Sequence, residues 1–211
     1  MSELEYNEGA FWVKNGSDKR KVTSPEELQR LFQSSGKIYA DEAISFFGND
    51  IADREYRDSE DIEGDLAHQY KDGMSFLLRN LKKTQQGQHF NSLGILEVSQ
   101  VALEEVLQNA IIHRDYFKNA PIRVFIFDNR IEIISPGKQP NSLTVENIKF
   151  GNSAMRNALI ASFATKMLPY RGLGLGILNA LREQPNIEFY NDVEGEQFKV
   201  VIPRPEEKKS T

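Results

Sequence analysis

The sequence contains no cysteine, which excludes disulfide bonds, cysteine-ligated zinc and thiol catalysis. No apolar run approaches the roughly 20 residues that a membrane-spanning helix needs. The first residues, MSELEYNEGAF, lack the basic-then-apolar pattern of a secretion signal. Only three histidines are present, and His68 and His89 have no partner at metal-ligand spacing. These absences predict a cytoplasmic protein without a membrane anchor or a zinc site.

The overall composition is that of a globular protein: 39% of the 211 residues are hydrophobic and 27% are charged. This length accommodates one medium domain and a smaller element. The net charge is −5, so the chain is not a general nucleic-acid binder, although a local basic patch remains compatible with it. Helical and strand-like segments follow one another without a regular βαβ order, which indicates an α+β fold.

The first third of the chain carries weaker structural signals. Residues 10–14 (AFWVK) have the composition of a short strand, and an Asn-Gly turn follows at 15–16. The Ser-Pro-Glu-Glu run at 24–27 is typical of a helix start and predicts a helix to about residue 34. Residues 49–64 are polar and acidic, which predicts a surface linker or short broken helices, and the linker is placed at 49–61.

From residue 62 onwards the expected elements are more distinct. They are a helix within 62–83, an amphipathic helix at 99–115, a hairpin of strands at 122–128 and 131–134, short helices near 144–149 and 156–166, a helix that follows the glycine-rich loop 172–176, and strands at 187–192 and 196–202. Together they predict a domain at 62–203. Residues 204–211 are expected to be a disordered tail.

The helix at 99–115 has a core stripe and a polar edge. The stripe consists of apolar residues at helical spacing: Leu103, Val106, Leu107, Ala110 and Ile111. Glu105, Asn109 and His113 are four residues apart, so they lie above one another beside the stripe. A carboxylate can take a proton from water, and an amide oxygen can ligate a hard cation. Spacing alone favours a solvent-exposed helix face, because Glu and Asn are common there.

The run at 103–116, LEEVLQNAIIHRDY, resembles the nucleotide-binding N-box of a divergent group of GHKL ATPases, which typically reads E-x-x-x-N-A-x-x-H-R-D-Y. The resemblance implies that Glu105 is the general base and that Asn109 holds Mg²⁺. It also implies that His113 and Arg114 lie near the phosphates or order the helix end. Protein kinases share the HRD motif, but this sequence lacks their glycine-rich loop and DFG motif.

Two later motifs continue the resemblance. The group usually reads N-P-G after the hairpin, which implies that Pro136 and Gly137 contribute to an adenine pocket. Ser135 departs from this pattern, because a hydroxyl cannot reproduce an amide or a carboxylate. Arg156 and Asn157 match an R-N motif in the lid over the nucleotide, which implies a phosphate contact and a brace for the loop. A Pro-Gly turn and a helix start with a solvated arginine are the alternatives.

The glycine-rich loop resembles the second glycine box of the same family. Gly172, Gly174 and Gly176 precede a helix, so backbone N–H groups could approach a phosphate at the helix N-terminus. Close packing of helix on sheet is the alternative. The loop is neither a Walker A motif, since no Gly-Lys-Ser/Thr follows, nor a Rossmann fingerprint, since the spacing differs.

Residues 9–34 resemble the end of a Schlafen/AlbA-type DNA-binding domain, which implies that 1–48 is the remnant of such a domain. Its turn is basic, and a solvated basic turn is the alternative to a phosphate contact. The basic residues are Lys14, Lys19, Arg20 and Lys21.

Together, these resemblances imply a Bergerat-type two-layer α/β sandwich, with a mixed sheet and helices on one face, preceded by a small α/β remnant. The implied function is an ATP-binding module of a bacterial transcriptional regulator related to RecG helicase, with Mg²⁺ and slow hydrolysis. A degenerate, non-catalytic regulatory or dimerisation module is the alternative. The expected partners are a nucleotide, DNA through an adjacent domain and a second copy of the chain.

Overall fold

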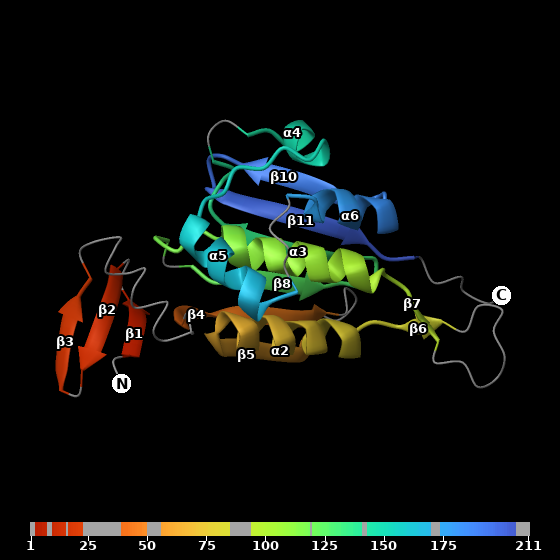
Figure 1. Ribbon diagram of the computed structural model, residues 1–211. Coiled ribbons are helices and arrows are strands. Elements are labelled where there is room, and N and C mark those ends of the chain that lie inside the picture. Colours follow the sequence, from red (N-terminus) through yellow and green to blue (C-terminus); the bar gives the residue numbers. More distant parts are fainter. Residues whose placement is uncertain are drawn as a thin grey trace, which may run out of the picture.

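A mixed six-stranded sheet is the centre of the computed structural model, which describes residues 3–7, 10–15, 17–22, 39–49, 56–84, 94–118, 120–140, 143–169 and 174–205. The strand order is β10-β11-β9-β8-β4-β5 (Figure 1). The strands are β4 (Tyr39–Asn49), β5 (Tyr56–Asp65), β8 (Ile122–Ile126), β9 (Arg130–Pro136), β10 (Glu188–Asp192) and β11 (Gln197–Pro203). Neighbouring strands are antiparallel except β4 and β8, which are parallel.

Helices cover one face of this sheet. Figure 1 shows α3 (Gln100–His113) at the centre of the helical layer, with α2 (Leu66–Arg79) and α6 (Gly176–Glu183) on either side. Of the short helices, α5 (Ala158–Met167) contacts α3, and α4 (Val145–Lys149) lies beside β10 and contacts α6 (Figure 1). The predicted α+β class and the two-layer sandwich are therefore confirmed. Within the described residues, no helix has the length and apolar character required to cross a membrane.

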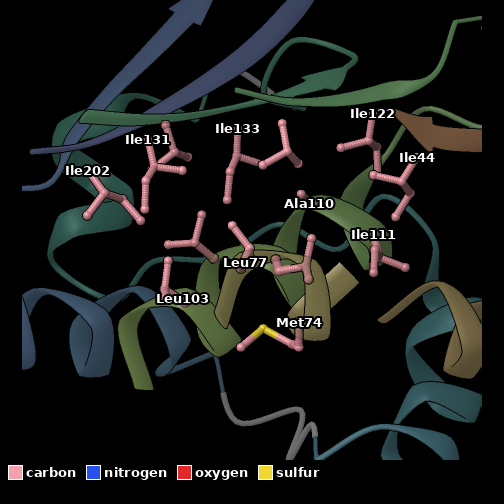
Figure 2. Packing of buried hydrophobic residues seen from close by; sticks show 14 of the residues in the cluster. Ile44, Met74, Leu77, Leu103, Ala110, Ile111, Ile122, Ile131, Ile133 and Ile202 are labelled. Carbon is pink, nitrogen blue, oxygen red and sulfur yellow. The ribbon is translucent and has the colours of Figure 1, made fainter. Parts of the chain in front are cut away.

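The hydrophobic core lies between the sheet and the helices. Figure 2 shows isoleucines of the sheet facing apolar residues of α2 and α3: Ile44, Ile122, Ile131, Ile133 and Ile202 oppose Met74, Leu77, Leu103, Ala110 and Ile111. Every residue of the predicted α3 stripe is buried. The helix begins at Ser99, whose hydroxyl accepts the N–H of Ala102 and so satisfies one of the free N-terminal donors.

The N-terminal strands form a separate antiparallel sheet of β1 (Glu3–Asn7), β2 (Ala10–Asn15) and β3 (Asp18–Lys21). The strand predicted at 10–14 is present in β2, and β3 pairs with it as a hairpin. The helix predicted at 24–34 lies outside the described residues. The short strands β6 (Lys83–Thr84) and β7 (Ile95–Leu96) form a further pair.

The structure corrects the predicted linker and domain boundary. Residues 56–61 of the expected linker belong to β5, and β5 pairs with β4 inside the main sheet. The sheet therefore begins before residue 62 and takes β4 from the expected 1–48 remnant. The sequence did not reveal β5 because an edge strand needs few apolar residues. Among residues 58–65, the part of β5 whose burial the structure describes, only Ile62 is buried.

Arg204, which falls in the tail expected at 204–211, is part of the packed structure. Arg204 is buried, and its guanidinium donates to Oε1 of Glu97 at 2.7 Å and to the carbonyl of Phe127. Its own N–H donates to the carbonyl of Asn129 at 2.9 Å. These bonds hold the end of β11 against the loop between β8 and β9.

Candidate functional site

A cavity of about 480 Å³ lies between α3, the start of α6, the ends of β9 and β11, and the loop at 151–156. This volume is within the range of small-molecule sites, which is roughly 300–1,000 Å³. Apolar residues of the sheet form one part of its wall, and they are Ile133, Phe198 and Val200. The remaining wall comes from α3, α4, α6 and the neighbouring loops, and it mixes polar side chains with apolar ones such as Leu143, Ile148 and Met155.

The polar edge of α3 faces this cavity. Glu105, Asn109 and His113 all line it, so the solvent-exposed alternative does not apply to this edge. Nδ2 of Asn109 donates to the carbonyl of Glu105 at 2.8 Å, so the amide oxygen is the atom that remains to ligate a cation. Oε1 of Glu105 accepts a hydrogen bond from Nδ2 of Asn179, on α6, at 3.0 Å. The sequence did not single out Asn179, because nothing in the chain links it to a residue 74 positions earlier.

Helix α6 begins directly against this edge, at Gly176. A Cβ atom at this position would lie 2.6 Å from Oε2 of Glu105 and 2.9 Å from Nδ2 of Asn109. Only glycine fits there without displacing the two side chains. No described side chain caps this helix N-terminus. The first N–H groups of α6 therefore favour an anion at this end of the cavity. Gly174 lines the cavity as well, and Gly172 lies outside the described residues.

Arg156 provides positive charge at the other end. Its Nη1 lies 3.1 Å from Oδ2 of Asp115, and its Nη2 donates to the carbonyl of Lys138. Among the described residues its Nε is buried without a hydrogen-bond partner, so the guanidinium keeps one unused donor. Gly137 has a φ of +102°, and a Cβ there would lie 2.7 Å from Cβ of Asp115. Glycine therefore permits the close approach of the two loops.

His113 lies between these two ends and is largely buried. Burial lowers the pKa of His113 below its usual value, and the positive charge of Arg156 lowers it further. The imidazole is therefore neutral at pH 7, with one nitrogen as a donor and the other as an acceptor.

Ser135 occupies the sheet side of the cavity. Its side chain is buried, and its hydroxyl donates to the carbonyl of Ala110 at 3.1 Å. The hydroxyl proton is therefore used within the protein, and Ser135 is one of the residues that line the cavity. Ser135 can accept a hydrogen bond from a ligand but brings no charge.

Three of the predicted binding residues, Arg114, Pro136 and Asn157, do not line the cavity, and for Arg114 the geometry fits the other expectation, that it orders the helix end. Arg114 is fully buried, and its Nη2 donates to the carbonyl of Ala120 at 2.8 Å, so it orders the end of α3. The side chain of Pro136 is buried, and its carbonyl accepts the N–H of Asp115 at 2.8 Å. Both residues are buried next to residues that line the cavity and do not line it themselves.

Asn157 also lies behind the cavity wall. Its Nδ2 donates to the carbonyls of Ile112 and Arg114, at 2.8 and 2.7 Å. These carbonyls belong to the C-terminal end of α3, where backbone acceptors lack intrahelical partners. Asn157 is therefore a C-terminal cap of α3 supplied by another segment. Its role as a brace fits this geometry, whereas a contact with a ligand does not.

The described residues contain no group of three or more His, Asp or Glu side chains that could hold a metal ion. A cation in the cavity would therefore take most of its ligands from elsewhere. Mg²⁺ commonly uses one or two protein oxygens together with water and the phosphate oxygens of a substrate.

Comparison with known proteins supports the resemblance. Residues 119–202 match the family described as "Putative ATP-dependent DNA helicase recG C-terminal". This match confirms the resemblance to a divergent HATPase-type domain of RecG-related proteins, and it indicates an ATPase-like domain. No curated protein matches the chain.

A solved structure with a similar fold is that of the DIP2311 protein from Corynebacterium diphtheriae. The TM-score is 0.68 at 20% sequence identity, and the similarity covers 79% of this chain and 35% of that chain. At this identity the similarity shows the fold alone. This chain spans about a third of the length of that protein.

Proposed function

We propose that the cavity binds ATP together with Mg²⁺, and that the chain is a nucleotide-binding module of a RecG-related transcriptional regulator. One observation carries the proposal. The carboxylate of Glu105 and the amide of Asn109 meet the start of α6 at Gly176, inside a cavity of about 480 Å³. A carboxylate can act as a general base, an amide oxygen can ligate Mg²⁺, and a helix N-terminus can bind phosphate.

The residues present fit such a ligand. The amide oxygen of Asn109 would hold Mg²⁺, and the free N–H groups at the start of α6 would bind phosphate oxygens. Arg156 and Lys138 add positive charge at the opposite side of the cavity. The apolar residues Ile133 and Phe198 would pack against the adenine ring, and Ser135 would accept one hydrogen bond from adenine.

Slow hydrolysis would follow from the same geometry. Mg²⁺ held by Asn109 would supply positive charge beside the phosphate oxygens. Glu105 would orient a water in line with the terminal phosphate and accept its proton. The N–H groups of α6 would stabilise the charge that develops on the phosphate oxygens.

Occupancy of the cavity would also act on the loop at 151–156. A ligand group that contacts Arg156 would compete with Asp115 for the guanidinium, whose present contacts join this loop to the ends of α3 and β9. Nucleotide binding would thereby change the loop and signal to a partner domain.

Isothermal titration with ATP, ADP and GTP, in Mg²⁺ and in EDTA, tests the proposal. We expect Mg²⁺-dependent ATP binding by the wild type, weaker binding by Asn109→Ala, and binding without turnover by Glu105→Ala. If Asn109→Ala binds ATP in Mg²⁺ with the affinity of the wild type, Asn109 is not the metal ligand. If Glu105→Ala still hydrolyses ATP, Glu105 is not the general base.

A non-catalytic regulatory or dimerisation module is the second candidate. Ser135 favours it, because its hydroxyl proton is already bound by the carbonyl of Ala110 and no carboxylate stands there to recognise a base. Absence of binding at millimolar ATP would support this candidate, and sedimentation equilibrium would then test for a dimer.

DNA binding by the N-terminal part is a separate proposal. Strand β3 exposes Lys19, Arg20 and Lys21 on a short edge. A mobility shift that weakens with salt, and weakens again when these residues are replaced by alanine, would support it.

A further inference from the structure

Asn179 is a second polar residue that acts directly on Glu105. It lies on α6, one turn after Gly176, and its Nδ2 donates to Oε1 of Glu105 at 3.0 Å. Both side chains line the cavity. We infer that Asn179 is a positioning residue that fixes the Glu105 carboxylate for proton transfer. The inference rests on the proposed function, because it assigns a partner to the proposed base.

The two oxygens of Glu105 have different surroundings. Oε1 is bound by Asn179, whereas Oε2 lies beside Gly176 at the first turn of α6. That turn is the proposed phosphate site. The hydrogen bond therefore restricts rotation of the carboxylate and leaves Oε2 as the oxygen that can accept a proton from a water near the proposed phosphate site.

The amide of Asn179 is suited to this role. It donates a hydrogen bond without a formal charge, so it orients the carboxylate and leaves its negative charge unpaired. Asn109 makes a different contact, because its Nδ2 donates to the backbone carbonyl of Glu105 and not to the carboxylate oxygen that Asn179 binds. The two asparagines therefore have separate roles, one toward a cation and the other toward the base.

A purely structural role for Asn179 is the alternative, since the bond also joins α3 to α6. The packing of α6 has other sources, however. Ala180 is fully buried, and Ile177 and Leu181 pack against the core. Removal of the amide should therefore change stability little and change the chemical step more.

Steady-state kinetics of three variants separates the two roles. Asn179→Leu removes the donor at similar volume, Asn179→Asp replaces it with a like charge, and Asn179→Gln keeps a donor on a longer side chain. We expect kcat to fall roughly tenfold to a hundredfold in the first two variants, as for a misplaced catalytic group. The dissociation constant of Mg-ATP should change less than about threefold, and Asn179→Gln should recover part of kcat.

Asn186→Asp is the matched control, because Asn186 is exposed in the turn after α6 and does not line the cavity. It should behave as the wild type. A fall in kcat accompanied by an equal loss of nucleotide affinity and a lower Tm would show a structural role and would overturn the inference. Binding of ATP by the wild type without any turnover would also overturn the inference.

The contact itself is tested without nucleotide by NMR of the Asn179 side-chain amide, assigned through its loss in Asn179→Asp. We expect the amide proton that faces Glu105 to shift upfield in Glu105→Ala. Lack of ATP binding by the wild type would remove the proposed function, even if this shift occurred. An unchanged amide resonance would overturn the inference, even if ATP bound.

Discussion

Gly176 lies where α6 meets the polar edge of α3, with no room for a Cβ atom. In Gly176→Ala the added methyl group would displace Glu105 and Asn109, at an overpacking cost of about 1–3 kcal/mol. The better helix propensity of alanine offsets about 1 kcal/mol of this cost. We therefore expect a small loss of stability and a large loss of nucleotide affinity, measured by urea unfolding and titration calorimetry.

A double-mutant cycle with Glu105→Ala provides the control. When the carboxylate is absent, the alanine at 176 loses one of its two close neighbours, so the stability cost of the two changes should be less than additive. Strictly additive costs, or an unchanged affinity of Gly176→Ala, would contradict the proposed close approach.

The buried imidazole of His113 should make stability dependent on pH. Its pKa in the folded protein lies below the value of 6.5 that an exposed histidine has, because of burial and the charge of Arg156. Between these values the unfolded chain binds a proton that the folded protein does not bind, so the free energy of unfolding falls as the pH decreases through 6.5. We expect this decrease between about pH 7.5 and about pH 5.5 in urea unfolding.

The variant His113→Gln should show a weaker pH dependence over the same interval. His68→Gln, on the exposed face of α2, is the control for loss of a histidine and should keep the dependence of the wild type. Equal pH profiles for His113→Gln and the wild type would remove His113 as the source.

The end of α3 depends on a cap from another element, which is the amide of Asn157. In Asn157→Ala the carbonyls of Ile112 and Arg114 lose their bond to Nδ2, at a cost of about 1–3 kcal/mol. The free energy of unfolding from urea titration measures this cost. Asn152→Ala, in the neighbouring loop, is the control and should change stability by less than about 0.5 kcal/mol. A stability of Asn157→Ala equal to that of the control would contradict the assignment as a cap.

The elements predictable from sequence were those in which apolar residues recur at helical spacing or form a continuous run. Helix α3 combines a helical apolar period with a motif, so both its bounds and its polar edge were predictable, and β9 and β11 followed from their apolar runs. Strand β5 was missed because its residues are mostly charged, and only its pairing with β4 shows that it is a strand. Asn179 and the Arg156–Asp115 pair were missed because their partners are distant in the chain.

At the scale of the molecule, the cavity joins two parts of the chain. The family match covers 119–202 and therefore includes Arg156 and α6, whereas Glu105 and Asn109 on α3 precede it. The proposed base and the proposed cation ligand belong to one segment, and the proposed phosphate site belongs to the other. The two segments meet only in the folded domain, where the helices pack on the sheet. The site should therefore be lost when the domain unfolds.

Arg204, near the C-terminal end of the described residues, helps to hold the folded domain together. Its ion pair with Glu97 is almost fully buried, since the side chains are 5% and 7% exposed. In Arg204→Met the Glu97 carboxylate would remain buried without its cation, at a cost of about 3–5 kcal/mol. We expect a correspondingly lower Tm by calorimetry. Arg182→Met, an exposed arginine of α6, should leave Tm unchanged, and an equal Tm for both variants would contradict this role.

A crystal structure with a non-hydrolysable ATP analogue and Mg²⁺ tests the central claim most directly. We expect the phosphates at the start of α6 beside Gly176, Mg²⁺ at the amide oxygen of Asn109, and a water near Oε2 of Glu105. The claim would be contradicted by an analogue bound outside this cavity, or by an empty cavity in crystals grown at saturating analogue.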